Sequence, residues 1–160
     1  MTTLESCAER FLKIFPAGEG GSQPTESSLR TIQDRLGFSI PGDFAEFARM
    51  CPAYHGWFVS IGEDFEDGRH ILKLNALHHS PEYCVLPPEL IMINHGYDGD
   101  FDCYDLSKRD ETSRISICYL EANESEYPLV RASRKHVAFS LVEYLEPQLV
   151  FWERIERKAK

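Results

Sequence analysis

The sequence predicts an α+β domain: a mainly antiparallel, twisted sheet of about five to six strands, with helices at the N- and C-terminal ends. Three observations support this fold class. Apolar residues recur at three- and four-residue spacing near both ends of the chain, as on helices that bury one face. The middle instead carries short runs of aromatic and β-branched residues bounded by turn-forming residues. Most of these runs are too close together for an intervening helix, which favours antiparallel neighbours.

Local signals define the first two helices. Thr2 followed by Glu5 predicts a capping box at the start of the first helix, and Pro16 ends it. The second helix is expected over residues 26–36, with Gly37 in the usual C-terminal capping position. The Gly- and Pro-rich segment between these helices is expected to be a loop, and it is too short to separate two domains.

The rest of the chain is expected to pass from helix to strands and back. Pro41 begins a third helix, because proline is tolerated in the first helical turn. The strand-like runs that follow are Trp57–Ile61, His70–Leu74, Leu90–Asn94, Phe101–Leu106 and Ile115–Leu120. Ser140 and Glu143 then form a second capping box. Pro147 is expected to break this helix and to start a last one that ends near residue 157.

Length and composition define a broad class. The chain has 160 residues, of which 42% are hydrophobic and 27% charged, as expected for one globular domain. Its longest stretch without a charged residue has 13 residues, whereas a membrane-spanning helix needs about 20. Neither a membrane segment nor a secretion signal is expected. The five cysteines are dispersed and form no Cys-x-x-Cys pair, which favours buried free thiols and a cytoplasmic location.

The negative charge of the chain is concentrated in its middle. The formal net charge is −9, and residues 60–127 contain fifteen acidic and five basic residues. Such a surface repels phosphate backbones, so nucleic acid is not expected as a partner. It suits a cationic protein or a metal ion; the alternative is a solvated acidic face that only maintains solubility. The acidic residues expected to point outward from turns and to bind a partner are Asp64, Glu66, Asp67, Asp98, Asp100 and Asp102.

No motif in the sequence predicts a metal site, a cofactor or catalysis. Asp98, Asp100 and Asp102 have the opening rhythm of a calcium loop, but Cys103 and Arg109 stand where an EF-hand needs glycine and glutamate. The histidines and cysteines do not have the paired spacing of zinc sites. There is no Gly-x-Ser-x-Gly elbow and no phosphate-binding loop. The protein is therefore expected not to be an enzyme and to need no cofactor.

Two segments together resemble the SUKH superfamily. The first is Leu36–Phe47, where Leu-Gly, a short link, proline, an acidic residue and an aromatic residue open the third helix. The second is the apolar run Leu90–Asn94, followed by Gly99–Phe101 and by Tyr104–Leu106. It is similar to the central hairpin of the superfamily. Phe139–Leu141, together with the helix that follows, also resembles the superfamily pattern.

The resemblance implies one SUKH-like domain over residues 1–160 and a function in protein binding. The superfamily contains fungal cell-wall synthesis regulators and bacterial immunity proteins that neutralise polymorphic toxins. We expect a non-catalytic immunity protein that binds a cognate toxin domain, for example a nuclease with a positive cleft. The alternative is a regulatory interaction module of the cell-wall-regulator type with no toxin partner. The chain departs from the usual Asn-Gly of the superfamily at Tyr54-His55-Gly56.

Overall fold

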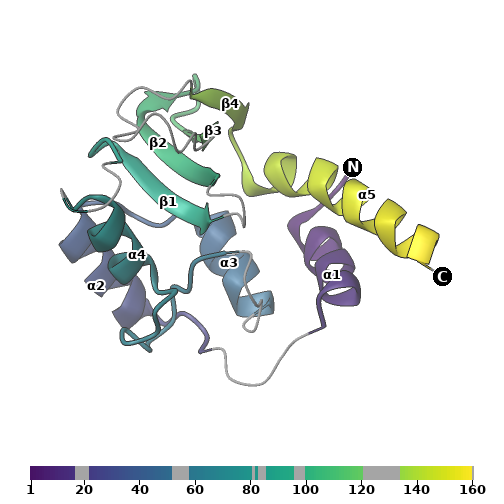
Figure 1. The fold of residues 1–160 in the computed structure, drawn as a ribbon, viewed down its shortest axis with the longest axis horizontal. Helices are drawn as coiled ribbons and strands as arrows, with labels where there is room; N and C mark the ends of the chain where they lie inside the picture. Colours follow the sequence, from purple (N-terminus) through teal and green to yellow (C-terminus); the bar gives the residue numbers. More distant parts are fainter. Residues whose placement is uncertain are drawn as a thin grey trace.

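A computed structural model describes residues 1–16, 22–51, 58–80, 82, 86–95, 100–120 and 134–159, which contain five helices and four strands (Figure 1). The helices are α1 (Leu4–Ile14), α2 (Glu26–Leu36), α3 (Gly42–Met50), α4 (Ile71–His78) and α5 (Leu141–Ala159). The strands are β1 (Leu90–His95), β2 (Phe101–Arg109), β3 (Ile115–Leu120) and β4 (Lys135–Ala138). They form an antiparallel sheet in the order β1-β2-β3-β4. None of the described helices has the length and apolar character needed to cross a membrane.

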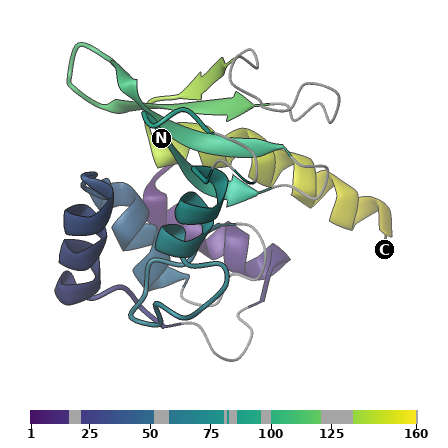
Figure 2. The same cartoon turned by 60° about the vertical axis from the view of Figure 1, so that its left-hand side comes forward.

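The two faces of the sheet bury different side chains. Tyr104 of β2 and Ile117 of β3 are opposite each other and belong to the larger core, to which all five described helices contribute. The neighbouring pair, Cys103 and Cys118, belongs to a smaller core on the other face. This alternation follows from the two-residue period of a strand. Figure 2 shows α1 to α4 gathered on one side of the sheet, and Figure 1 shows α5 running beside α1.

The helix ends follow the local signals closely. α2 has the predicted bounds, and Gly37 caps it in the left-handed conformation at φ 63°, which glycine adopts without steric cost. The cap of α1 differs by one residue from the prediction: Thr3, not Thr2, accepts a hydrogen bond from the backbone N–H of Ser6. α3 begins at Gly42, one residue later than predicted, and Pro41 is its N-cap. Short-range capping contacts therefore decide the boundaries of α1 and α2.

The segment predicted as a strand at His70–Leu74 is a helix, so this prediction is wrong. His70 is the N-cap of α4, and its Nδ1 accepts a hydrogen bond from the backbone N–H of Leu72 at 3.2 Å. Its Nε2 donates to the carbonyl of Gly62 at 3.2 Å. A short apolar run fits a strand or a buried helix equally well by periodicity. The hydrogen bonds of His70 to Leu72 and to Gly62 in the preceding loop favour the helix over the strand.

Within the ranges that the structure describes, the sheet has fewer strands than predicted. β1, β2 and β3 are confirmed, with β2 three residues longer than expected. The described part of Trp57–Ile61 forms only an isolated bridge from Ser60 to His70. β4 was not predicted, because its four residues, KHVA, are too short and too polar to give a strand signal. The described residues thus form a four-stranded antiparallel sheet, where about five to six strands were predicted.

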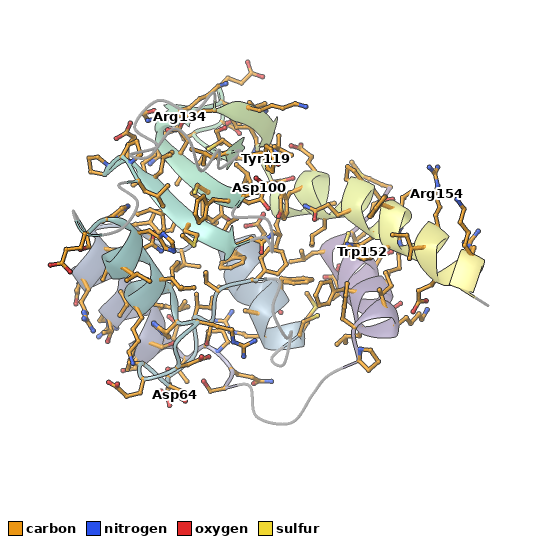
Figure 3. All side chains as sticks on the ribbon, viewed as in Figure 1. Asp64, Asp100, Tyr119, Arg134, Trp152 and Arg154 are labelled. Carbon is orange, nitrogen blue, oxygen red and sulfur yellow. The ribbon has the colours of Figure 1, made fainter. Side chains whose placement is uncertain are left out.

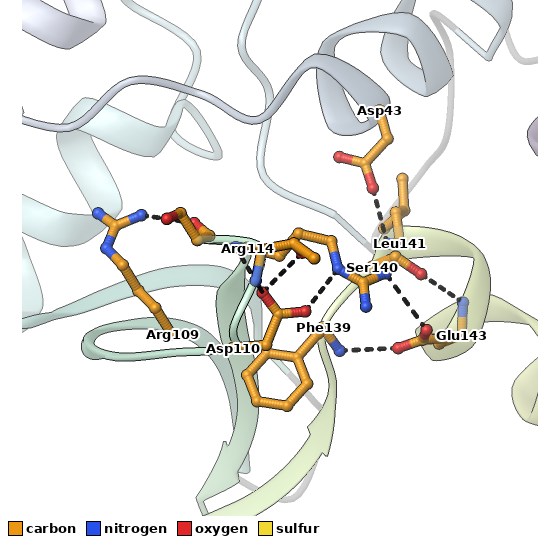
Figure 4. A network of polar contacts seen from close by, with 10 residues as sticks. Asp43, Arg109, Asp110, Arg114, Phe139, Ser140, Leu141 and Glu143 are labelled. Carbon is orange, nitrogen blue, oxygen red and sulfur yellow. Dashed lines mark hydrogen bonds and ion pairs between the residues drawn. The ribbon is translucent and has the colours of Figure 1, made fainter.

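The C-terminal helix is continuous, so the predicted break at Pro147 is wrong. Pro147 lies inside α5 on an exposed position, where water can reach the backbone carbonyl that loses its hydrogen bond. The N-terminal cap of the helix is confirmed: the Ser140 hydroxyl accepts from the backbone N–H of Glu143 at 3.2 Å. The Glu143 carboxylate in turn accepts from the backbone N–H of Phe139 at 2.9 Å (Figure 4).

The described cysteines are buried and form no disulfide, as predicted. They are Cys7, Cys51, Cys103 and Cys118, and Cys84 lies outside the described residues. Burial raises the pKa of the Cys51 thiol to about 12 and that of Cys118 to about 12. These thiols are therefore protonated at neutral pH and act as small hydrophobic side chains.

Candidate functional site

The acidic residues predicted to bind a partner do not form one surface. Asp64, Glu66 and Asp67 lie in the loop before α4, whereas Asp100 and Asp102 lie at the start of β2. Figure 3 shows Asp64 and Asp100 at separate places on the molecule. Asp98, the remaining residue of the predicted set, lies outside the described residues. The predicted set therefore divides into a loop group and a sheet group.

The carboxylates of the loop group organise the loop itself. Asp64 accepts a hydrogen bond from the backbone N–H of Glu66 at 3.1 Å, and Asp67 accepts one from the backbone N–H of Arg69 at 2.9 Å. Glu66 forms an ion pair with Lys73 of α4 at 2.9 Å, which lowers the pKa of the glutamate. Asp64 and Glu66 are nevertheless exposed, as predicted. The formation of local turns therefore accounts for the run of acidic residues in this loop.

The sheet group belongs to a row of polar residues that crosses all four strands. In the strand register Asn94 of β1 pairs with Asp102 of β2, Asp102 pairs with Tyr119 of β3, and Tyr119 pairs with Lys135 of β4. Residues directly opposite each other on paired strands share a face. Tyr144 of α5 joins this row through its bond to Asp102. The polar row therefore continues the face that carries the larger core.

Asp102 is the central residue of this row. Its Oδ2 accepts hydrogen bonds from the Tyr144 hydroxyl at 2.5 Å and from the Asn94 side-chain amide at 2.9 Å. Asp102 lies in a strand and is half-buried, so the prediction that it points outward from a turn is wrong. Burial raises the pKa of Asp102, the two hydrogen bonds oppose this increase, and the charge of Asp100 adds to it. Among the described residues no cationic side chain forms an ion pair with Asp102.

Asp100 lies beside this carboxylate. Its Oδ2 accepts a hydrogen bond of 2.5 Å from the hydroxyl of Tyr119, and both side chains are half-buried. Both residues are labelled in Figure 3. Two carboxylates thus stand close together on one face of the sheet, and each is held by a tyrosine hydroxyl. Like charges at this spacing disfavour each other, which is why the neighbouring charge raises the pKa of Asp102.

A cavity of about 430 Å³ opens at Asp102 between the sheet and α5. The lining residues are Asp102, Tyr119, Lys135, His136, Val137, Tyr144 and Gln148, and we call this cavity the Asp102 groove. Asp102 and two tyrosines supply oxygen atoms to the groove, and its exposed lining residues are Lys135, His136 and Val137. A half-buried carboxylate acceptor near the exposed Val137 suits a cation on an aliphatic chain, such as the side chain of lysine or arginine.

Metal binding finds no support in the geometry of this site. In the part of the chain that the structure describes, no three His, Cys, Asp or Glu residues are grouped so that they could hold a metal ion. His136 lines the Asp102 groove, but its Nδ1 is hydrogen-bonded to the hydroxyl of Ser116 at 2.7 Å.

The sequence identified the acidic residues of the groove but missed the side chains that hold them. Tyr144 was expected only on the buried face of the last helix, and it is 1% exposed. A buried tyrosine normally has a hydrogen-bond partner for its hydroxyl. A tyrosine on the buried face of the last helix therefore indicated that a polar group, here Asp102, would lie next to it. Tyr119 and Lys135 join the site through the strand register, which the sequence does not give.

No protein-family model matches the chain, and no curated protein matches it.

Proposed function

We propose that this protein is a non-catalytic binding module whose Asp102 groove takes a basic side chain of a partner protein. We further propose that the partner is a toxin domain, which the binding neutralises. The observation that carries the proposal is the half-buried carboxylate of Asp102, which among the described residues receives hydrogen bonds from neutral donors only. The second support is the resemblance of Leu36–Phe47 and of the β1–β2 hairpin to the SUKH superfamily, which includes immunity proteins.

A carboxylate that is partly removed from water loses hydration free energy, which interactions with other groups must replace. Hydrogen bonds from Tyr144 and Asn94 supply part of it, but they bring no positive charge, and Asp100 adds a negative one. Partial burial of a charge without an opposite charge is unfavourable in a monomer. A lysine or arginine of a partner that enters the groove would complete this site and form a charge-assisted hydrogen bond.

The charge of the whole chain supports the same kind of partner. With a formal net charge of −9, the protein attracts basic proteins over a distance of about one Debye length, roughly 8 Å at physiological ionic strength. Many toxin domains act on nucleic acids, and their substrate clefts are positive. The exposed Asp64 and Glu66 contribute to this attraction from the loop before α4, whereas the groove supplies the specific contact.

The first experiment is capture of partners from the native cell lysate, with identification by mass spectrometry. A toxin-like partner supports the immunity function. A cell-wall-related regulatory partner without toxin activity supports the alternative, a regulatory interaction module. Neither outcome alone tests the groove, so the captured partner is then used for binding measurements.

The second experiment compares Asp102→Asn with Asp64→Asn by surface plasmon resonance at two salt concentrations. Both hydrogen bonds to Asp102 end on one oxygen, so an asparagine carbonyl can accept both while the charge is lost. We expect Asp102→Asn to weaken binding by about 2 kcal/mol, roughly 30-fold, mainly through faster dissociation. Asp64→Asn is exposed and lies in the loop group, so it should only slow association slightly. Equal affinity of wild type and Asp102→Asn would exclude the groove as the binding site.

A further inference from the structure

A second cavity, of about 630 Å³, lies on the sheet face of Tyr104, towards the tip of the β2–β3 hairpin. It is formed by the link between α2 and α3, by this hairpin and by the first residues of α5; we call it the hairpin pocket. Its apolar lining includes Phe38, Ile40, Leu106, Ile115 and Phe139. Its volume is within the range of about 300–1,000 Å³ that is usual for small-ligand sites.

Tyr104 lies on the inner wall of this pocket with a hydroxyl group that has no hydrogen-bond partner among the described residues. The residue is 2% exposed, and its ring packs against Phe38 and Phe44 with centroid distances of 5.4 and 6.2 Å. Burial and the nearby charge of Asp43 raise the pKa of Tyr104, so the hydroxyl keeps its proton and is a donor. A buried donor without an acceptor is unfavourable, and a ligand oxygen would satisfy it.

The rim of the hairpin pocket holds an exposed arginine, Arg109. Arg109 is exposed, donates to the backbone carbonyl of Ser113 at 3.0 Å, and forms no ion pair among the described residues. Arg114, in contrast, pairs with Asp110 at 2.7 Å and with Glu143 at 3.5 Å (Figure 4).

The remaining carboxylate of the pocket, Asp43, is already occupied. It accepts hydrogen bonds from the backbone N–H groups of Phe44 and of Leu141, each at 2.8 Å. Its negative charge disfavours a second carboxylate near Tyr104 and favours a neutral carbonyl there. Among the described residues that line the pocket, the groups left for a ligand are therefore the neutral Tyr104 hydroxyl on the inner wall and the Arg109 cation at the rim.

We propose that the hairpin pocket binds a short acylated peptide that ends in a free carboxylate. A carbonyl oxygen of the ligand accepts from Tyr104, the carboxylate lies against Arg109, and apolar side chains fill the space beside Phe38 and Leu106. The same chemistry is offered by a free acyl dipeptide and by the C-terminus of a protein. This site is separate from the Asp102 groove and does not depend on the function proposed for it.

The test is a titration of the ¹⁵N-labelled full chain, followed by two-dimensional NMR. The probes are N-acetyl-leucyl-leucine, its C-terminal amide, and a ten-residue peptide that ends in the same two leucines with a free carboxylate. We expect shift changes at residues 37–43, 104–115 and 139–141 with the probes that bind. Stronger binding of the longer peptide assigns the site to a protein C-terminus, and equal or weaker binding assigns it to the free acyl dipeptide.

Two variants separate the roles of the two side chains. Tyr104→Phe removes only the hydroxyl, so it should weaken both the acid and the amide by about tenfold without lowering stability. Arg109→Gln should weaken the acid by about tenfold and leave the amide unchanged. Arg30→Gln, an exposed arginine on α2 outside the pocket, is the control and should change neither. Absence of shift changes in the pocket, or equal affinity of Tyr104→Phe and wild type, would overturn the proposal.

Discussion

Removal of one buried amide, that of Asn75, should destabilise the whole sheet. Asn75 is 0% exposed and lies in α4, beside the outer edge of β1. Its Oδ1 accepts from the backbone N–H of Met92 at 2.8 Å, and its Nδ2 donates to the backbone carbonyl of Met92 at 3.1 Å. A third bond joins Nδ2 to the carbonyl of Ile71 at 2.9 Å. Asn75→Ala would leave both backbone groups of Met92 buried without a partner.

The loss of stability in Asn75→Ala can be calculated from the backbone N–H and C=O groups of Met92. Each buried backbone group that loses its partner costs about 1–2 kcal/mol, and alanine recovers about 0.5 kcal/mol through its higher helix propensity. We therefore expect the free energy of unfolding to fall by roughly 2–3 kcal/mol, and Tm by about 5–10 °C for a domain of this size.

Two measurements test this prediction. Urea unfolding gives the change in stability, and hydrogen exchange followed by NMR reports the Met92 amide, whose protection should fall more than that of β3 amides. Ala76→Asn, at the exposed neighbouring position, is the matched control and should cost only about 0.5 kcal/mol. A loss below about 1 kcal/mol for Asn75→Ala, or unchanged exchange at Met92, would refute the reasoning.

Three further predictions concern the core and two titrating groups. Phe44 is 0% exposed, so Phe44→Ala should cost about 3–5 kcal/mol in urea unfolding; a cost below about 1 kcal/mol would contradict its place in the core. Burial lowers the pKa of His70, so its stabilising effect is complete above about pH 6.5 and is lost as the pH falls through the lowered pKa. Wild type should therefore lose more stability than His70→Asn in this range, and parallel pH curves would contradict this. Burial raises the pKa of Asp102, so the folded state is favoured at low pH and loses stability as the pH rises through the raised pKa. Asp102→Asn should be more stable than wild type at pH 7 and equal to it below about pH 3, and an unchanged stability at pH 7 would count against this.

The sequence predicted those elements whose signals are local. α2 has the expected bounds because Thr25 and Gly37 supply caps within a few residues of its ends. α4 was mistaken for a strand because its apolar run suits both structures, and the contact between Asn75 and Met92 links positions 17 residues apart. β4 was missed because four residues, three of them exposed, give almost no pattern.

The candidate site was predicted only in part, for a related reason. Asp100 and Asp102 were identified by their charge, which a sequence shows directly. Their tyrosine partners were not, because Tyr119 and Tyr144 are 19 and 42 residues away from the carboxylates that they hold. The half-burial of Asp102 follows from the packing of α5 against the sheet, which no local pattern encodes.

The contacts along the outer edge of β1 also have a consequence for self-association. Besides Asn75, the backbone N–H of Val59 donates to the carbonyl of Ile93 at 2.9 Å, and His79 bonds to the carbonyl of Leu90 at 3.0 Å. These contacts occupy the groups with which an edge strand would otherwise recruit a strand of a second molecule. A chain that loses Asn75 would expose the apolar strand LIMINH to intermolecular pairing, and concentrated solutions of it would form β-rich aggregates.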